Sequence, residues 1–551
     1  MLLISIEIYR DFPDLGIIAV YGSFLLILYA ETHYKFPGIY SRLWKKEPEI
    51  IADLPHRLEP GFDLPVLILV KDAHLYPIEL IEVKIYCSEN PPRLLHKRDY
   101  HTKIQSEIWH SVIDIKLPDD ISGLCYFDVE IVVKVNGNTI VYRNDNYRLS
   151  SHAPFPVLID SEKLPIFSGW HYGDLHYHSS FTSDQVEFGA PLEPTVHMAK
   201  ALGLHFFAVT DHSYDLDDDM KNYLKNDPQA PKWQELWQEI HEINSSNNNF
   251  VIIPGEELSV GNSRNRNVHL LILNSRQLFI GAGDSAERWF VNKPEHKIAA
   301  VMQNIETGAL CFAAHPETAA PFLQRLLIRR GKWEKTDYDH KRLNGLQIWN
   351  GKTDHFFQKG MQKWAELLLS GRRLSIIAGN DAHGNFGRFR QIGFPFLTFH
   401  EKYSETFAQA KTAVLLDKPL NQANLLWGLQ KGKIAVTDGP LANMWFKRRD
   451  GSVCTIGDEI NDTAGELTVT VKSTGSFGFL QDINLFIGDI AKKTEIRRRI
   501  DVPSGRYNHE SRLVITDLPA SGYIRLSVTS MRGDKLYSCY TNHMFFSGMG
   551  F

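Results

Sequence analysis

The sequence is poor in cysteine. Its 551 residues include five cysteines, and no two of them form a Cys-x-x-Cys pair. The odd number and the wide spacing argue against a disulfide framework and against a zinc ribbon. A reducing compartment, and therefore a cytoplasmic location, is the expectation that fits best. Each cysteine is expected to be a small buried apolar residue rather than a nucleophile.

The chain also lacks a clear membrane-spanning run. The uncharged segment Leu15–Ala30 is shorter than the roughly 20 apolar residues that a spanning helix needs. It has neither the basic start nor the small-residue cleavage site of a secretory signal. Gly16 and Gly22 interrupt it, so a hairpin or a docked apolar segment is favoured over membrane contact through residues 15–30.

Charge of one sign is not in large excess. The formal net charge is −5, with 43% hydrophobic and 23% charged residues, as in an ordinary soluble protein. Such a balance does not provide a polyanion-binding surface, so nucleic acid is not expected as a partner. The oligomeric state does not follow from these numbers.

Three regions differ in their apolar patterns. Residues 1–165 and 431–551 contain short alternating runs divided by turn residues, which predict two β-sandwich-like domains. Residues 166–430 alternate apolar runs with helical stretches, which predicts βα units around a mostly parallel sheet or barrel. The expected class is therefore α/β, with a central barrel flanked by two β-rich domains.

Histidine, aspartate and glutamate residues follow six apolar runs of the central region. A βα barrel places its catalytic groups at such strand ends. On a strand, residues two apart point to the same side, so His176 and His178 are expected to face one metal ion. The side chains that we expect to gather are His176, His178, His212, Glu257, His269, His315, Asp381 and His383.

Each of these residues has an ordinary structural interpretation when taken alone. A histidine at a strand end is commonly hydrogen-bonded within the protein, and Asp-His after a strand is compatible with a turn and a helix cap. Six consecutive runs that end in this way have no such explanation. Imidazole and carboxylate ligands without thiolate suit Zn, Mn or Fe at a catalytic site.

The order of the motifs resembles the polymerase-and-histidinol-phosphatase (PHP) superfamily of metallohydrolases. His-x-His, Thr-Asp-His, Gly-x-Glu, His, Ala-His-Pro and Asp-x-His occur in that order within about residues 166–400. The segment Trp170–His176, with Thr437–Pro440 late in the chain, is similar to the carbaryl-hydrolase-like branch. This resemblance implies a distorted (β/α)7 barrel with accessory β-domains and two or three divalent metal ions.

The resemblance also implies roles for individual residues. One ion would be held by His176, His178, Glu257 and Asp381, and Glu257 would bridge to a second ion held by His269 and His315. A third ion would use Asp184, His212 and His383; many family members have histidine where this chain has Asp184. Asp174 and Asp211 precede ligands, so they are expected to orient imidazoles or to be turn residues.

The expected function is metal-dependent hydrolysis. A phosphoesterase that acts on a small phosphorylated substrate is the leading hypothesis, with His212, Asp381 and Arg388 as catalytic residues. Arg388 and Arg390 would clamp phosphate, or else are solvated loop arginines. The alternative is a carboxylic ester, amide or carbamate hydrolase at the same centre. A non-catalytic metal-binding module is a third hypothesis.

Overall fold

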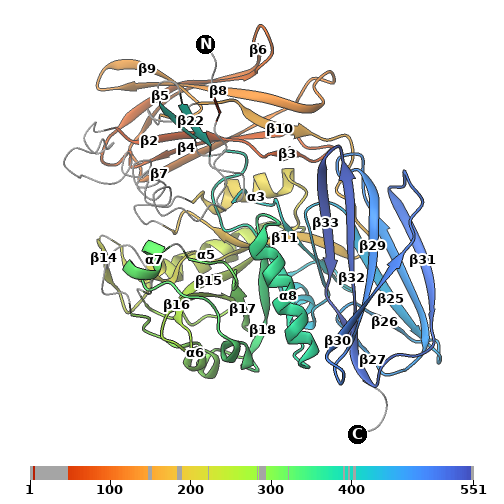
Figure 1. Cartoon of the computed structure of the whole chain (residues 1–551). Coiled ribbons are helices and arrows are strands. Elements are labelled where there is room, and N and C mark those ends of the chain that lie inside the picture. The colour runs from red at the N-terminus through yellow and green to blue at the C-terminus, as the bar shows by residue number, and fades with distance from the viewer. Residues whose placement is uncertain are drawn as a thin grey trace. The chain divides into compact units, whose positions relative to one another are not determined.

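The computed structural model describes residues 4–5, 47–146, 152–182, 189–220, 222–281, 283, 293–320, 322–388, 391–394, 397–400 and 405–547 (Figure 1). Asp184, Arg390 and the apolar run at 15–30 lie outside these residues. The chain divides into two compact units, each built from separate segments. The first comprises residues 1–161, 179–203 and 382–407, and the second comprises 162–178, 204–381 and 408–551.

The first unit consists mainly of β-strands. One sheet has the order β3-β10-β8-β5-β6, with β9 paired to β8, and a second has the order β2-β4-β7. A short sheet β1-β22-β21 belongs to the same unit. The bounds are β1 Ile4–Ser5, β2 Glu49–Asp53, β3 Arg57–Leu58, β4 Leu64–Lys71, β5 Ile78–Cys87, β6 Arg93–Ile104, β7 Ile108–Ile115, β8 Gly123–Val135, β9 Asn138–Arg143, β10 Phe155–Ile159, α3 Leu192–Ala201, β20 Ala382–His383, β21 Gln391–Phe394 and β22 Leu397–His400.

The core of this unit follows from strand alternation. In β5 buried and partly buried residues alternate except at residues 81–82, and Leu80, Val83 and Ile85 belong to the same core as Val129 and Ile131 of β8. Strand β4 is buried along its whole length and contributes to the same core. A strand buried on both faces reads as a continuous apolar run, as Leu64–Lys71 does.

The second unit contains the strands from which the candidate ligands project. Its main sheet follows the order β19-β18-β17-β16-β15-β12-β11-β23-β24-β33-β32-β29-β30, and a smaller sheet has the order β26-β25-β28-β31. The bounds of the strands that matter for the site are β11 Trp170–His178, β12 Phe206–Val209, β15 Val251–Gly261, β16 Asn267–Leu273, β17 Leu310–Ala314, β18 Leu343–Asn350 and β19 Ser375–Gly379.

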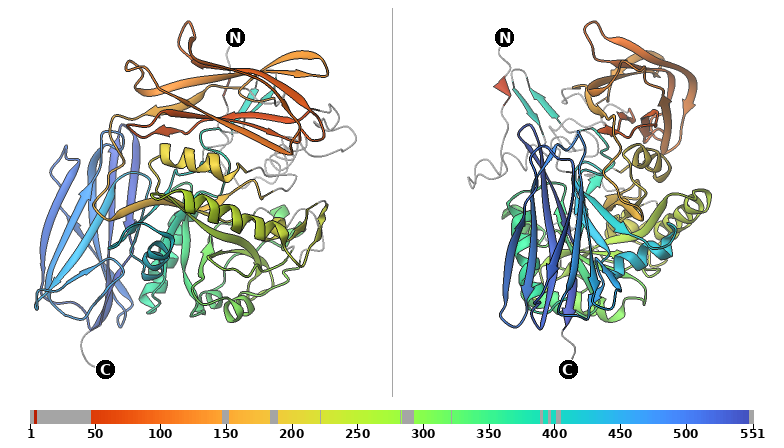
Figure 2. Two further views of the ribbon diagram at one scale, coloured as in Figure 1. Left: turned by 180° about the vertical axis from the view of Figure 1, so that it is seen from behind. Right: turned by 90° about the vertical axis from the view of Figure 1, so that its right-hand side faces the viewer.

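The remaining elements of the second unit complete the sheets and pack against them. Helices α5 and α8 contact β15 and β18, respectively; both are labelled in Figure 1, and α5 is seen from the other side, in yellow-green, in the left view of Figure 2. The bounds are α4 Ser213–Leu216, β13 Asp218–Asp219, β14 Asn222–Asn226, α5 Pro231–Ser246, α6 Ile298–Asn304, α7 Phe322–Leu327, η2 Lys335–Asp339, α8 His355–Leu369, β23 Lys411–Leu415, α9 Gln422–Lys431, β24 Ile434–Thr437, β25 Leu441–Arg448, β26 Val453–Thr455, β27 Glu459–Ile460, β28 Gly465–Lys472, β29 Phe479–Asp489, β30 Thr494–Ile500, β31 Asn508–Ile515, β32 Ser521–Arg532, β33 Lys535–Thr541 and β34 Met544–Ser547.

The predicted fold class, an α/β protein with a (β/α)7 barrel, is wrong. Of the residues that the structure describes, 46% lie in strands and 16% in helices, so this part of the chain is mostly β. Strands β15, β16 and β17 pair antiparallel, as do β11, β23 and β24, and the sheet continues into the C-terminal strands β33, β32, β29 and β30. The reason is a short connection: only residues 262–266 separate β15 from β16, which is too few for the crossover that parallel pairing requires.

The boundaries 165 and 430 are not those of the two units, and the three consecutive domains stay a prediction. Among the described helices, none combines the length and the apolar character that crossing a bilayer requires.

Candidate metal centre

Strand β11 brings two histidines to one place. His176 and His178 are both fully buried, and their Nε2 atoms lie 3.1 Å apart. The end of the strand is held by the Asp174 carboxylate, which accepts hydrogen bonds from the backbone N–H groups of His176, Asn380 and Ala408. Asp174 therefore anchors the backbone that carries the histidines, and the expectation that it orients an imidazole is corrected.

Glu257 and Asp381 complete a first group around these histidines. Asp381 Oδ1 lies 3.1 Å from His178 Nε2 and 3.2 Å from His176 Nε2. Glu257 lies 3.5 Å from His176 and 3.6 Å from His178. One ligand atom from each of the four residues lies within 4.8 Å of the others, so a single cation fits among them.

The two oxygens of Glu257 face different partners. Oε1 lies 2.6 Å from His269 Nδ1 and 3.1 Å from His315 Nε2, which forms a second group of three possible ligands. Oε2 lies 3.1 Å from His212 Nδ1. A carboxylate placed in this way can contact two cations at once.

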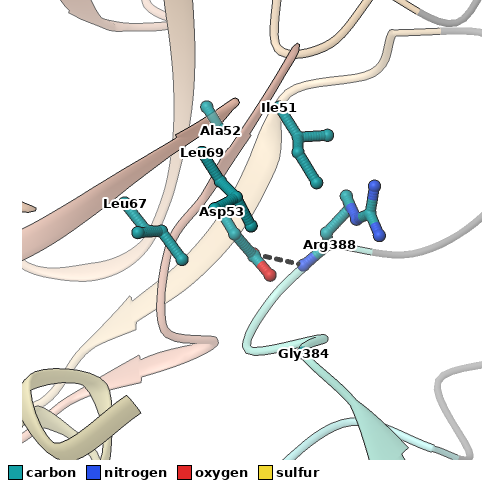
Figure 3. A pocket seen from close by; sticks show the side chains of 7 residues that line it. All are labelled: Ile51, Ala52, Asp53, Leu67, Leu69, Gly384 and Arg388. Carbon is teal, nitrogen blue, oxygen red and sulfur yellow. Dashed lines mark hydrogen bonds between the residues drawn. The ribbon is translucent and has the colours of Figure 1, made fainter. Parts of the chain in front are cut away.

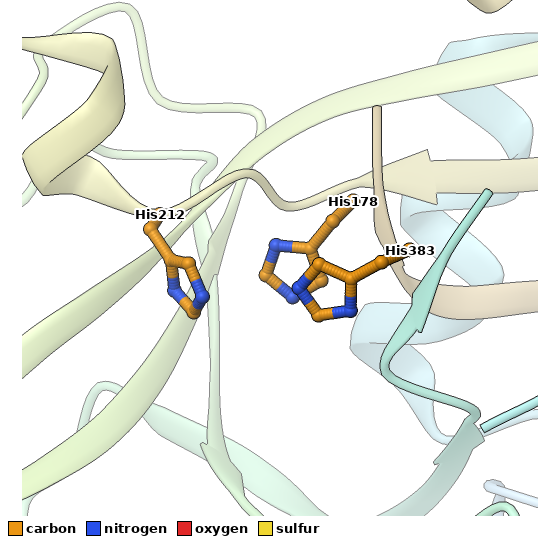
Figure 4. A group of neighbouring side chains, drawn as sticks. All are labelled: His178, His212 and His383. Atoms are coloured by element: carbon orange, nitrogen blue, oxygen red, sulfur yellow. The ribbon is translucent and has the colours of Figure 1, made fainter. Parts of the chain in front are cut away.

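Figure 4 shows how His178 and His212 are placed. His178 comes from the end of β11, and His212 follows β12 and precedes the short helix α4. The two ring centroids are 4.4 Å apart. His383, also drawn there, lies on β20 and belongs to the first unit. Its role as a metal ligand therefore stays a prediction.

A pair of amides orients this centre, and the sequence analysis missed both. Gln347 is fully buried on β18, and its Oε1 lies 2.8 Å from His176 Nδ1. Because an amide oxygen only accepts hydrogen bonds, Nδ1 carries a proton, which leaves Nε2 as the nitrogen that would bind a cation. Gln347 Nε2 donates to Asn350 Oδ1 at 3.0 Å, and Asn350 Nδ2 donates to Asp381 at 3.4 Å.

The centre is electrostatically unusual for a buried site. Burial alone would raise the pKa of Glu257, but the imidazoles of His269 and His176 outweigh it and hold that pKa well below its ordinary value. Asp381 shows the same balance: burial raises the pKa, and His176 and His178 lower it well below the usual range. Burial disfavours the charged form of His176, yet Asp381 and Glu257 raise its pKa to about 9.

The donor set fits divalent cations. His176 Nε2 and His178 Nε2 face each other, and both face carboxylate oxygens, at distances of 3.1 to 3.6 Å. The two facing imidazole nitrogens repel each other in a buried place unless a cation or a proton lies between them. Nitrogen and oxygen ligands without sulfur suit Zn, Mn or Fe.

Two of the possible ligands have a constrained backbone. His315 has φ 30° and Asp381 has φ 55°, so both lie in the left-handed region that non-glycine residues seldom adopt. Such conformations persist where the surrounding structure holds them, commonly at functional sites. Asp381 is held by a hydrogen bond from its own N–H to the carbonyl of His176 at 2.9 Å.

Glu256 belongs to a different environment from Glu257. It is fully buried, its Oε2 accepts a hydrogen bond from the Ser213 hydroxyl at 2.5 Å, and burial raises its pKa to about 8. Adjacent residues on a strand point to opposite faces, so only one of the two glutamates faces the histidines. The side chain of Asp211 is fully buried, and its backbone carbonyl accepts from the N–H of Glu257 at 2.9 Å.

Arg388 lies in a pocket of the first unit, drawn in Figure 3. Its backbone N–H donates to Asp53 at 2.8 Å, and its Nη2 lies 3.5 Å from the side-chain oxygen of Asn385. The pocket is otherwise lined by aliphatic residues such as Leu67 and Leu69. These contacts provide no evidence for the phosphate clamp expected of Arg388.

Arg330 is a further residue that the sequence analysis did not single out. Its Nη2 lies 3.3 Å from His269 Nδ1, the same nitrogen that contacts Glu257. An arginine in a loop is common in any sequence, and no spacing rule connects position 330 with a strand-end histidine. Only the folded chain shows this proximity.

Comparisons with known proteins find no matching family model and no matching curated protein. The chain is similar to solved structures of glycoside hydrolases. A family 2 member from Bacteroides cellulosilyticus matches at 10% identity and a TM-score of 0.17, over 91% of this chain and 63% of that one. A β-glucuronidase from Parabacteroides merdae matches at 8% and 0.19, over 91% and 64%.

A calcium-binding mutant of β-glucuronidase 2 from Bacteroides uniformis also matches, at 11% identity and a TM-score of 0.18 over 91% of this chain and 61% of that one. The chain therefore spans less than two thirds of the length of these proteins. Likenesses with TM-scores this low assign neither a fold nor an activity to this chain.

The predicted family is corrected by these comparisons. No family model matches the chain, and none of the PHP superfamily is among the matches. The predictions of PHP membership, of the carbaryl-hydrolase-like branch, of phosphoesterase activity and of a phosphorylated substrate are therefore not retained. The candidate metal centre itself rests on distances between side chains and not on the resemblance.

Proposed function

We propose that the second unit is a metal-dependent hydrolase that cleaves a carboxylic ester, amide or carbamate bond. The observation that carries this proposal is Glu257, whose two oxygens face different imidazoles: His269 and His315 on one side, His212 on the other. A buried bridging carboxylate surrounded by imidazole nitrogens is the ligand arrangement of a centre with two or more divalent ions.

The ligands divide between two positions. His176, His178, Glu257 and Asp381 would hold one ion, and Glu257 with His269 and His315 would hold another. Zn, Mn and Fe all accept this ligand set. A third ion at His212 stays a prediction.

The two ends of the centre differ in access. The side chains of His176, His178 and Glu257 are 0–1% exposed, whereas that of Asp381 is 23% exposed and that of His315 is 11% exposed. A substrate would therefore approach on the side of Asp381 and His315. Divalent ions in such a centre supply a water of lowered pKa and polarise the bond to be cleaved.

The protein's own groups would hold the reacting atoms in place. Gln347 fixes the proton of His176 on Nδ1, and Asn350 holds Asp381 by a hydrogen bond. The exclusion of water around His176 and Glu257 strengthens each electrostatic contact. His212, beside Glu257 and stacked on Tyr214 with ring centroids 4.6 Å apart, is the residue that we propose for proton transfer to the leaving group.

The same electrostatics disfavour the two-carboxyl mechanism of most glycosidases. That mechanism needs one carboxylic acid that stays protonated near neutral pH. Imidazoles hold the pKa of both Glu257 and Asp381 well below the ordinary range, so neither is such an acid. Burial raises the pKa of Glu256 to about 8, but its side chain points to the opposite face of β15 from Glu257. An aryl glycoside nevertheless belongs in the experimental panel, because the matched structures are glycoside hydrolases.

The experiment uses full-length protein reconstituted with Zn, Mn or Fe. The panel comprises 4-nitrophenyl acetate, a 4-nitrophenyl carbamate, a 4-nitroanilide, 4-nitrophenyl β-glucuronide and 4-nitrophenyl phosphate. Wild type is compared with His176→Ala and Asp381→Asn, and with His241→Ala as a control on the exposed face of α5. We expect acyl-bond hydrolysis to fall at least about 100-fold in the two centre variants and to be unchanged in the control.

Three outcomes would contradict the proposal. The first is hydrolysis of the glucuronide or the phosphate alone. The second is acyl-bond hydrolysis that survives His176→Ala. The third is a protein that binds no divalent ion after reconstitution, as measured by elemental analysis.

A further inference from the structure

Four exposed apolar side chains form a row at one end of the C-terminal strands of the second unit. Phe479 is the first residue of β29, and Met531 and Leu536 flank the turn between β32 and β33 (Figure 1). Phe479 is paired with Met531, and Met531 is paired with Leu536, so these three side chains stand next to one another on one face of the sheet. The ring of Tyr507 lies against that of Phe479, with centroids 4.5 Å apart.

The row faces solvent because of the alternation of the strands. Phe479 and Met531 are each 41% exposed, Leu536 is 54% exposed and Tyr507 is 36% exposed. Leu480, the next residue of β29, is 3% exposed and belongs to the interior. The core on the inner face is therefore complete without the row. Exposed apolar side chains that gather in this way mark a surface for a partner.

The backbone holds the row in place. A Cβ on Gly478 would collide with the carbonyl of Met531, so the chain passes β32 too closely for another residue. The N–H of Leu480 donates to the carbonyl of Arg506 at 2.9 Å, which ties the loop that carries Tyr507 to β29. A surface held in this way binds a partner without the entropic cost of ordering a loop.

Three cations flank the row. Arg506 lies in the loop beside it, and Arg532 and Lys535 are paired across the turn. All three are exposed, and none forms an ion pair with a carboxylate of the residues that the structure describes. The acidic residues of the same turn and loop are Asp534 and Asp501, so cations are in excess beside the apolar row.

The size of the row argues against a protein partner. With about 200 Å² for each whole residue, the four together expose roughly 350 Å². A stable protein interface buries about 800 Å² on each partner. A membrane has no such minimum, because it takes up individual apolar side chains while cations beside them contact anionic headgroups.

We propose that this row, with its flanking cations, docks on the surface of a membrane that contains anionic lipids. The apolar side chains would enter the boundary between headgroups and acyl chains, and the cations would lie among the headgroups. A tyrosine suits this depth, because its ring is apolar and its hydroxyl is polar. The inference does not depend on the proposed function, since no residue of the row belongs to the candidate metal centre.

The test measures sedimentation of the full-length protein with lipid vesicles. One set consists of phosphatidylcholine alone, and the other contains phosphatidylcholine and phosphatidylserine in equal amounts. We expect at least about tenfold stronger binding to the vesicles with phosphatidylserine. High salt should weaken that binding, because salt screens the attraction between the cations and the headgroups.

Two double variants separate the apolar contribution from the charged one. Phe479→Ser with Leu536→Ser should weaken binding to the anionic vesicles about tenfold or more, because two apolar side chains no longer leave water. Arg532→Gln with Lys535→Gln should weaken the same binding about 10- to 30-fold and remove most of its dependence on salt.

A matched control lies on β30, away from the row. Ile496→Ser with Arg498→Gln also removes an exposed apolar side chain and an exposed cation. Ile496 is paired with Ile487, which lies eight residues beyond Phe479 along β29. This control should bind the anionic vesicles as wild type does, within about twofold.

Three results would overturn the inference. One is wild-type protein that does not sediment with the anionic vesicles. Another is binding that persists in both double variants while their Tm equals that of wild type. The third is a dimer, seen by light scattering, that dissociates in the Phe479→Ser, Leu536→Ser variant, because the row would then contact a second copy of the chain. The variant of Arg532 and Lys535 changes only exposed side chains at a turn, so it keeps the test decisive if the apolar variant does not fold.

Discussion

Replacing Gln347 with leucine tests the centre most directly, because it removes two hydrogen bonds and leaves every proposed ligand in place. Gln347 is fully buried, with Oε1 2.8 Å from His176 Nδ1 and Nε2 3.0 Å from Asn350 Oδ1. Leucine occupies a similar volume and offers neither acceptor nor donor. His176 would then have no partner from residue 347 to keep its proton on Nδ1.

The size of the effect follows from these contacts. A buried polar group that loses its partner costs about 1–3 kcal/mol, and here both the Nδ1–H of His176 and the Asn350 oxygen are affected. Loss of the group that orients a ligating histidine typically costs about 10–100-fold in metal affinity or activity. We therefore expect Gln347→Leu to weaken binding of the ion held by His176 by about 10–100-fold.

Chelator competition would measure metal affinity in wild type, Gln347→Leu and Gln347→Glu. The glutamate variant keeps an acceptor for His176 and should retain most of the affinity. Gln358→Leu, an exposed position on α8, controls for the loss of a glutamine. Equal affinities for wild type and Gln347→Leu, within about twofold, would refute the proposal that Gln347 orients a metal ligand.

Three further substitutions test other parts of the structure. Glu257→Gln should lower the bound metal by at least one ion per chain in elemental analysis, because one charged oxygen is lost from between two ligand groups. Gly379→Ala should lower the free energy of unfolding by about 1–3 kcal/mol, seen as a lower Tm, because the added Cβ would lie 2.5 Å from the Cβ of His176. Asp53→Asn should flatten the dependence of stability on pH between about 4 and 6, measured by urea unfolding.

The sign of the Asp53 effect follows from proton binding. Burial raises the pKa of Asp53 from 3.8 to about 6 in the folded protein. Between those values the folded chain holds a proton that the unfolded chain has lost, so stability decreases as pH rises, by up to about 3 kcal/mol. A wild-type stability that increases over this range, or an unchanged slope in Asp53→Asn, would contradict this assignment.

The positions of the candidate ligands could be anticipated from local pattern. An apolar run that ends abruptly in a histidine or a carboxylate is visible in the sequence, and the ends of strands in one sheet lie near one another. The structure brings His176, His178, His212, Glu257, His269, His315 and Asp381 together. Asp184 lies outside the described residues, and His383 lies in the first unit.

The fold could not be anticipated in the same way, because local periodicity predicts a strand but not its direction. The runs at 251–261 and 267–273 look like strands of two successive βα units, yet the loop between them admits no helix and they pair antiparallel. The family expectation failed for a related reason. Short motifs around histidine recur wherever metals are bound, and they do not specify how the intervening chain is folded.

The residues that the sequence analysis missed share one property: their significance depends on a partner far away in the chain. Gln347 meets His176 across 171 positions, and Arg330 meets His269 across 61. Amide and guanidinium groups occur throughout a soluble protein, so their type carries little information without that partner. Histidines and strand-end carboxylates are informative as a set, because burying several of them in one region is costly. The sequence therefore predicts the candidate ligands of such a centre better than it predicts the groups that contact and orient those ligands.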